Sequence, residues 1–156
     1  LEKVRPTDDE LAQVMGHEIA HALANHVAEH MSVAMASTIG ATVVGTAIAA
    51  KHEHYGLALT GAALAATLAI ELPNNRTQEA EADRIGIELA ARAGFDPRAA
   101  VTLWEKMARV GGKAPPEILS THPAPEHRME AMRALVPQML PIYEAARKKY
   151  RGLSCR

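Results

Sequence analysis

Apolar residues recur at three- and four-residue steps along the first part of the chain, which is the spacing of one face of an α-helix. The members of this series are Leu11, Val14, Met15, Ile19, Leu23 and Val27. Thr7-Asp8-Asp9-Glu10, just before the series, has the form of a capping box, with Pro6 just outside it. The pattern therefore predicts an amphipathic helix from about residue 8 into the thirties.

The rest of the chain is also predicted to be helical. Only 3% of the residues are aromatic, and small residues dominate the apolar fraction, which favours closely packed helices over stacked sheets. Between polar or proline-containing breaks, we expect apolar helical stretches over 38–50 and 57–72, a helix from Asn74 or Asn75 to about Ala93, one from Asp96-Pro97 to Gly111, one near 125–135 and one over 137–150. With 156 residues and no repeat or low-complexity linker, the chain is predicted to be one mainly α-helical domain, 1–156.

Residues 31–50 carry no charge over a length that could span a membrane. The stretch is rich in Ala, Thr, Gly and Ser, as are membrane helices that lie inside bundles. The alternative is a hairpin with residues 57–72 that packs on the domain, on a partner subunit or against a membrane face. Because no aromatic belt or basic flank marks an interface, we favour a soluble hairpin.

The charges of the chain nearly balance, with 17 basic and 18 acidic residues and a net charge of -1. A nucleic-acid binder would carry a basic surplus, so we expect no nucleic-acid partner. The single Cys155 cannot form an internal disulfide.

The clearest chemical signal is His17-Glu18-Ile19-Ala20-His21, which has the form H-E-x-x-H. Residues four apart on a helix share a face, so the two imidazoles can reach one metal ion. Zinc accepts neutral imidazole nitrogens and keeps a position for water in a catalytic site. Glu18 can take a proton from that water. The pattern predicts one Zn²⁺ ion per chain.

A third metal ligand must come from another part of the chain. The single-helix form of the motif would need glycine at 24 and histidine at 27, where the chain has Ala24 and Val27. In a later predicted helix, Glu79 and Asp83 are four apart and share a face, whereas Glu81 points to the other side. One of these two carboxylates can bind zinc while the other orients a ligand histidine through its free ring N–H, and Glu79 is the best donor.

Four motifs occur in an order that covers nearly the whole chain. They are HEIAH at 17–21, Glu79-Ala80-Glu81-Ala82-Asp83 within 76–86, Ala93-Gly94-Phe95-Asp96-Pro97, and Leu119-Ser120-Thr121-His122-Pro123 followed by Arg128. Together they resemble the M48 family of zinc metallopeptidases, in its Oma1-like and BepA/LoiP-like branch. The resemblance implies a zincin-like helical metalloprotease core and an endopeptidase that acts on polypeptides, with misfolded envelope or membrane proteins as the expected substrates.

The resemblance also assigns roles to individual residues. Those assigned to Zn²⁺ are His17, His21 and Glu79. Glu18 is implied to be the general base, and Asp83 the carboxylate that orients a ligand. His122 and Arg128 match the family's H-P-x-x-x-x-R element and are candidates to stabilise the oxyanion. The histidine of that element can instead cap the zinc as an inhibitory fourth ligand.

One departure from the family motivates a second hypothesis. Family members carry strands before the metal-binding helix, one of which pairs with extended substrate. Leu1 stands only sixteen residues before His17, so we expect that segment to be missing, as in a processed or truncated catalytic domain. The alternative function is a zinc-containing, non-proteolytic module that binds client proteins. The implied location is the bacterial periplasm or cell envelope, or alternatively the mitochondrial inner membrane; membrane association and homo-oligomerisation stay open.

Overall fold

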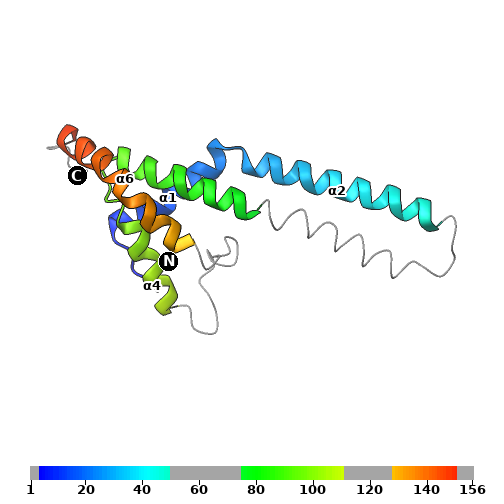
Figure 1. The fold of residues 1–156 in the computed structure, drawn as a ribbon, viewed down its shortest axis with the longest axis horizontal. Coiled ribbons are helices and arrows are strands. Elements are labelled where there is room, and N and C mark those ends of the chain that lie inside the picture. The colour runs from blue at the N-terminus through cyan, green and yellow to red at the C-terminus, as the bar shows by residue number, and fades with distance from the viewer. Residues whose placement is uncertain (1–3, 50–74, 111–127, 151–156) are drawn as a thin grey trace. The chain divides into compact units, whose positions relative to one another are not determined.

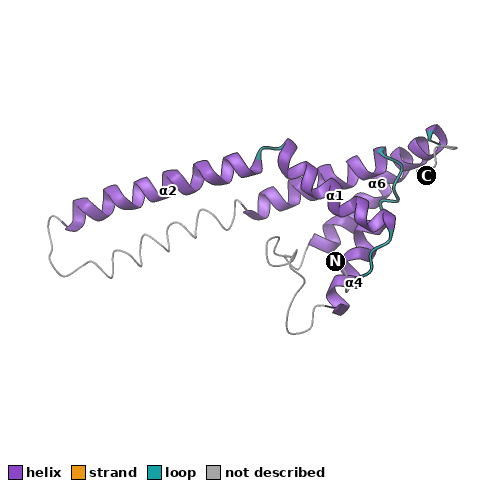
Figure 2. Ribbon diagram, turned by 180° about the vertical axis from the view of Figure 1, so that it is seen from behind, coloured by secondary structure: helices purple, strands orange, loops and turns teal. Residues whose placement is uncertain are grey.

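The computed structural model describes residues 4–49, 75–110 and 128–150. Within these ranges the chain forms helices and no strand, as Figure 1 and Figure 2 show, which confirms the mainly α-helical fold class. The chain divides into two compact units. The first consists of Leu1–Ala24 and Glu79–Arg156, and the second is Asn25–Gln78.

The first helix, α1 (Asp8–Leu23), begins at the predicted capping box. The Thr7 N–H donates to the Glu10 carboxylate at 2.8 Å, and the Glu10 N–H donates to the Thr7 hydroxyl at 3.2 Å. The prediction that this helix continues into the thirties is wrong. Asn25 adopts a φ of 57°, a left-handed conformation that asparagine tolerates and that interrupts a right-handed helix. A new helix, α2 (His26–Ala49), follows at once and includes most of the predicted 38–50 stretch.

The helix over residues 75–92 ends at the predicted glycine. Gly94 has a φ of 90°, its N–H donates to the Ala91 carbonyl, and the Phe95 N–H donates to the Ala90 carbonyl, both at 3.0 Å. These two bonds form a Schellman motif, in which only glycine adopts the required φ without strain. The predicted start at Asn74 and the 57–72 stretch lie outside the described residues.

The next helix, α4 (Ala99–Val110), begins at Ala99 and not at Pro97 as predicted. Asp96 still caps this end, since its side chain accepts a bond from the Arg98 N–H at 2.9 Å and its carbonyl accepts one from the Ala99 N–H at 3.1 Å. The Arg98 side chain donates to both carboxylate oxygens of Asp96, and these bonds hold the pKa of the Asp96 carboxyl below its ordinary value.

The last helix, α6 (Arg128–Lys149), is continuous where two helices were predicted. Pro137 and Pro141 both lie inside it, although each removes one backbone hydrogen bond. Three residues spaced seven apart, Met132, Met139 and Ala146, are buried along one face of α6 on both sides of the prolines. This burial outweighs the lost bonds, because tertiary packing supplies most of the stability of a protein helix.

The core of the first unit forms where α4 packs against both α1 and α6. Trp104 is partly buried and contacts two apolar clusters. The buried members of the first cluster are Ile87, Ala91, Ala100, Met132 and Met139. Those of the second are Val4, Leu103 and Met107.

Two glycines bring α1 and the 75–92 helix into backbone contact. A methyl group at Gly16 would lie 2.6 Å from the Gly86 carbonyl oxygen, and one at Gly86 would lie 2.7 Å from the His17 backbone nitrogen. No larger residue fits without separating the two helices. Because Gly16 precedes His17 and Gly86 lies three residues after Asp83, this crossing sets how closely the candidate site residues of the two helices approach.

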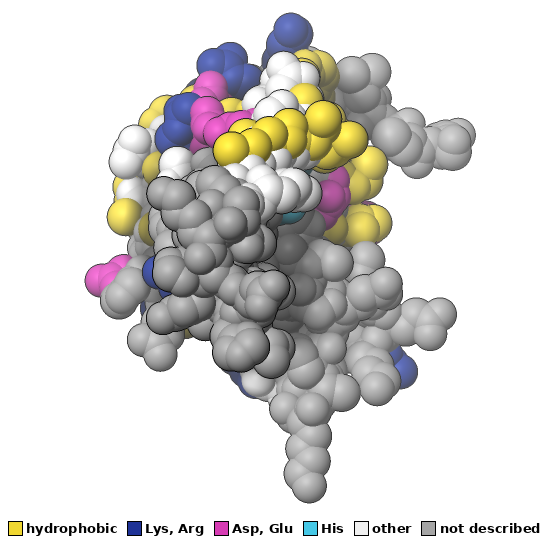
Figure 3. Space-filling view, turned by 90° about the vertical axis from the view of Figure 1, so that its right-hand side faces the viewer, with side chains coloured by type: hydrophobic (Ala, Val, Ile, Leu, Met, Phe, Trp, Pro, Cys, Tyr) yellow, Lys and Arg dark blue, Asp and Glu magenta, His cyan; other side chains and the backbone are white. Residues whose placement is uncertain are grey.

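In the second unit, α2 presents large apolar side chains to solvent. Those more than half exposed are Val27, Met31, Met35, Ile39 and Val43. Hydrophobic side chains lie at the molecular surface beside charged ones in the space-filling view of Figure 3. Among the described helices, none combines the length and hydropathy that a bilayer crossing requires.

Candidate metal centre

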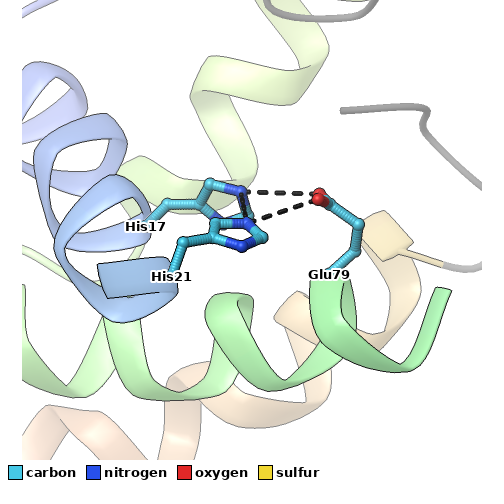
Figure 4. A group of neighbouring side chains, drawn as sticks. All are labelled: His17, His21 and Glu79. Atoms are coloured by element: carbon cyan, nitrogen blue, oxygen red, sulfur yellow. Dashed lines mark hydrogen bonds and ion pairs between the residues drawn. The ribbon is translucent and has the colours of Figure 1, made fainter. Parts of the chain in front are cut away.

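Two histidines of α1 and one carboxylate of the 75–92 helix come together in the first unit. Figure 4 shows the rings of His17 and His21 directed at the carboxylate of Glu79. The two Nε2 atoms are 3.1 Å apart. His17 Nε2 lies 3.4 Å from Glu79 Oε2, and His21 Nε2 lies 3.3 Å from Glu79 Oε1.

These distances fit one metal ion. Ligand atoms about 2.0–2.1 Å from a tetrahedral zinc ion lie about 3.4 Å from one another. The Nε2–Nε2 separation of 3.1 Å, and the separations of 3.4 and 3.3 Å from the two Nε2 atoms to Oε2 and Oε1 of Glu79, are close to this value. Three protein ligands of this kind leave a fourth position for water or substrate, as catalytic zinc requires. The three residues could therefore hold zinc without rearrangement of their helices.

The two carboxylates lie on opposite sides of the His17 ring. Glu79 lies on the Nε2 side, and Asp83 Oδ1 lies 3.0 Å from Nδ1. Asp83 is buried and is one helical turn from Glu79, as the spacing of the acidic residues predicts. A proton on Nδ1 that bonds to Asp83 leaves the Nε2 lone pair for a metal.

The same contacts change the acidity of His17. Burial alone would lower the pKa of the ring, but the bonds and charges of Asp83 and Glu79 outweigh this effect and raise the pKa to about 9. The metal-free site therefore holds a proton on His17 at neutral pH, and a bound metal must displace it.

Arg128 also belongs to this cluster, at the beginning of α6. Its Nε and Nη2 donate to the two oxygens of Asp83 at 2.7 and 2.6 Å, and its Nη1 donates to Glu79 Oε2 at 2.7 Å. The other member of the predicted His-Pro element, His122, lies outside the described residues. Glu18 follows His17 on α1 and is an exposed residue.

A comparison with known families agrees with this arrangement. The model of peptidase family M48 matches residues 1–136. The chain belongs to peptidase family M48. This confirms the family that the four sequence motifs indicated.

Several curated proteins are similar to this M48 chain over about half of its length. Mitochondrial metalloendopeptidase OMA1 of Bos taurus is 47% identical over 76 residues, which are 46% of this chain and 14% of that protein. The beta-barrel assembly-enhancing protease of Escherichia coli (strain K12) is 47% identical over 88 residues, 54% of this chain and 18% of that protein. OMA1 of Saccharomyces cerevisiae is 40% identical over 81 residues, which are 48% of this chain and 24% of that protein. The alignments thus cover about a quarter or less of each relative. No solved structure matches the chain significantly.

A separate polar network fixes the beginning of α1 in this M48 chain. Asp9 Oδ1 accepts a bond from the Asp96 N–H at 3.0 Å, and Gln13 Nε2 donates to the Asp96 carbonyl at 3.1 Å. Buried Glu10 accepts bonds from the Thr102 hydroxyl at 2.7 Å and from Lys106 Nζ at 2.6 Å. These bonds hold α1 against α4 and the turn before it.

Sequence reasoning missed three residues that shape the metal centre. Gly16 and Gly86 form the helix crossing, and the ring of Trp104 lies 4.7 Å from the guanidinium carbon of Arg128. A glycine inside a predicted helix destabilises it by roughly 1 kcal/mol, so two such glycines beside candidate ligands are a usable signal of close packing. No spacing rule pairs a tryptophan with a distant arginine.

Proposed function

We propose that this M48 chain carries the catalytic centre of a zinc-dependent endopeptidase, with Zn²⁺ on His17, His21 and Glu79. The main support is that the two Nε2 atoms lie 3.1 Å apart and lie 3.4 and 3.3 Å from the two carboxylate oxygens of Glu79, separations close to those within a tetrahedral zinc site. Membership of a peptidase family supports the same reaction class.

The residues around the metal divide the chemistry among them. Bound zinc would act as a Lewis acid on a peptide carbonyl and on the attacking water. Glu18, adjacent to His17, takes a proton from that water and returns it to the leaving nitrogen. Asp83 keeps the His17 ring in the tautomer that presents Nε2. His122 is kept as a candidate for the oxyanion or for an inhibitory fourth ligand.

The proposed substrates are polypeptides, and misfolded envelope or membrane proteins in particular. The names of the relatives describe metalloendopeptidases and a protease that enhances β-barrel assembly, so the proposed role is quality control. We place the protein in the bacterial periplasm or envelope, with the mitochondrial inner membrane as the alternative. Membrane association and self-association are proposed as features to test.

Replacement of the general base tests the reaction. We expect Glu18→Gln to bind zinc as the wild type does and to cleave an unfolded substrate such as casein about 10²- to 10⁴-fold more slowly. Glu88→Gln is the matched control, since that side chain pairs with Arg92 on the surface of the 75–92 helix. Wild-type turnover in zinc-loaded Glu18→Gln would overturn the proposal.

The same assay separates the protease from a non-proteolytic zinc module. Cleavage that stops on addition of a chelator and returns with zinc supports the protease. Zinc binding together with capture of unfolded casein, but without cleavage, supports the module that binds client proteins.

A further inference from the structure

Arg128 is a buried cation that contacts two carboxylates of the candidate metal centre. Its side chain is 6% exposed, and the side chains of its partners Asp83 and Glu79 are 6% and 7% exposed. Its guanidinium carbon lies over the ring of Trp104, at 4.7 Å from the centroid. A guanidinium has a rigid, planar set of donors, so such a site fixes both its position and its plane.

Each bond from Arg128 restricts one carboxylate. The bond to Glu79 goes to Oε2, the oxygen that lies 3.4 Å from His17 Nε2, while the other oxygen, Oε1, lies 3.3 Å from His21 Nε2. The two bonds to Asp83 form a fork on both carboxylate oxygens. One of these, Oδ1, is also the atom 3.0 Å from His17 Nδ1. Arg128 thus contacts the partners of both histidines.

We propose that Arg128 is a positioning residue of the zinc site, which holds Glu79 to coordination through one oxygen and holds Asp83 against His17. This inference rests on the proposed zinc endopeptidase function. It differs from the role at the oxyanion that the family resemblance implies for Arg128, because a positioning residue acts through Glu79 and Asp83 and not on the substrate. Removing the cation from two buried carboxylates would leave uncompensated charge in the protein interior, which is strongly unfavourable.

Two opposite effects on zinc affinity make the proposal testable. A positive group so near the metal repels it, so loss of Arg128 would strengthen zinc binding if charge were its main contribution. Loss of an orienting group weakens binding, typically by about 10- to 100-fold. The proposal predicts weaker binding, because Glu79 could then rotate and Asp83 could leave the His17 ring.

The experiment uses the full chain, stripped of metal, and measures Zn²⁺ affinity by competition with a chromogenic chelator. The variants are Arg128→Gln and Arg128→Lys, with Arg133→Gln as the control in the same helix, since Arg133 forms an exposed pair with Glu105. We expect affinity about 10- to 100-fold weaker for Arg128→Gln and a clear loss for Arg128→Lys, which keeps the charge without the fork. The visible absorption of bound Co²⁺ should change in both, and Arg133→Gln should match the wild type.

Each outcome bears on one claim. A wild type that binds no zinc overturns the proposed function itself. A wild type that binds zinc, with unchanged or tighter binding and an unchanged Co²⁺ spectrum in both Arg128 variants, overturns only the positioning role. If Arg128→Gln does not fold, the Co²⁺ spectrum of Arg128→Lys is used in its place. A second check is the double variant with Asp83→Asn, in which the two losses of Zn²⁺ affinity should not add, because both changes act on the same contact.

Discussion

Two successive helices of this protein are specified in different ways. The helix α1 is defined by contacts with residues distant in sequence: Gly16 touches Gly86, and buried Glu10 bonds to Thr102 and Lys106. The described side chains of α2 show the opposite arrangement.

The hydroxyl groups of α2 bond to its own backbone. Ser32, Thr38, Thr42 and Thr46 each donate to the carbonyl four residues earlier, at 2.8 to 3.0 Å. A methyl group at Gly40 would meet no atom within 4 Å. Among the described residues, close side-chain complementarity therefore lies at the candidate metal centre, whereas the hydroxyl bonds of α2 stay within that helix. Matched substitutions in the two helices can break or sharpen this contrast.

The largest difference is expected for glycine to alanine. At Gly86 the new methyl group would lie 2.7 Å from the His17 nitrogen, so Gly86→Ala should destabilise the first unit by about 3 kcal/mol and weaken zinc binding. At Gly40 the same change meets open space and should stabilise α2 by roughly 0.5–1 kcal/mol. Native-state amide hydrogen exchange on each helix measures both effects. If Gly86→Ala left the stability of the first unit unchanged, the two helices would not be as closely packed at this crossing as we describe.

The second pair of substitutions replaces one carboxylate in α1 and one in α2. Burial alone would raise the pKa of Glu10, but bonds from Lys106, the Thr7 N–H and the Thr102 hydroxyl lower it below 4.5. A lowered pKa stabilises the fold above pH 4.5, and this contribution is lost as the pH falls through the folded-state pKa. Glu10→Gln should therefore lower the free energy of unfolding by about 2 kcal/mol at pH 7 and by less at acidic pH.

Glu29→Gln is the control for that pair, because Glu29 is exposed on α2 and a surface change of this kind stays within about 0.5 kcal/mol. The free energy of unfolding in urea, measured between pH 3 and 7, gives both values. A penalty for Glu10→Gln that stayed constant across this range would contradict the assignment of the charge.

The smallest difference is expected for threonine to valine. The Thr102 hydroxyl donates to Glu10 Oε1 at 2.7 Å, so Thr102→Val should cost about 1 kcal/mol. The Thr42 hydroxyl donates to its own helix at the Thr38 carbonyl, so Thr42→Val should change the stability of α2 by less than about 0.5 kcal/mol. Hydrogen exchange at the two helices distinguishes the values, and equal effects would remove the contrast between distant and local bonding.

Local signals in the sequence determined the ends of several helices. The capping box at Thr7 and the glycine at position 94 act through bonds to neighbours three to five residues away, so a short stretch of sequence contains all the partners. The pairing of His17 with His21, and of Glu79 with Asp83, follows from helical periodicity for the same reason. The amino-acid sequence alone therefore indicated which of these four side chains could share one metal site.

Tertiary structure decided what depends on distant partners. The continuous α6 through Pro137 was mispredicted, because burial of Met132 and Met139 outweighs a local proline signal. Helical periodicity puts Glu79 and Asp83 on one face, but the distances of each from the His17 ring depend on how two helices cross at Gly16 and Gly86. The bonds from Arg128 to Asp83 and Glu79 join residues 45 and 49 positions apart, and no local pattern specifies contacts over that separation.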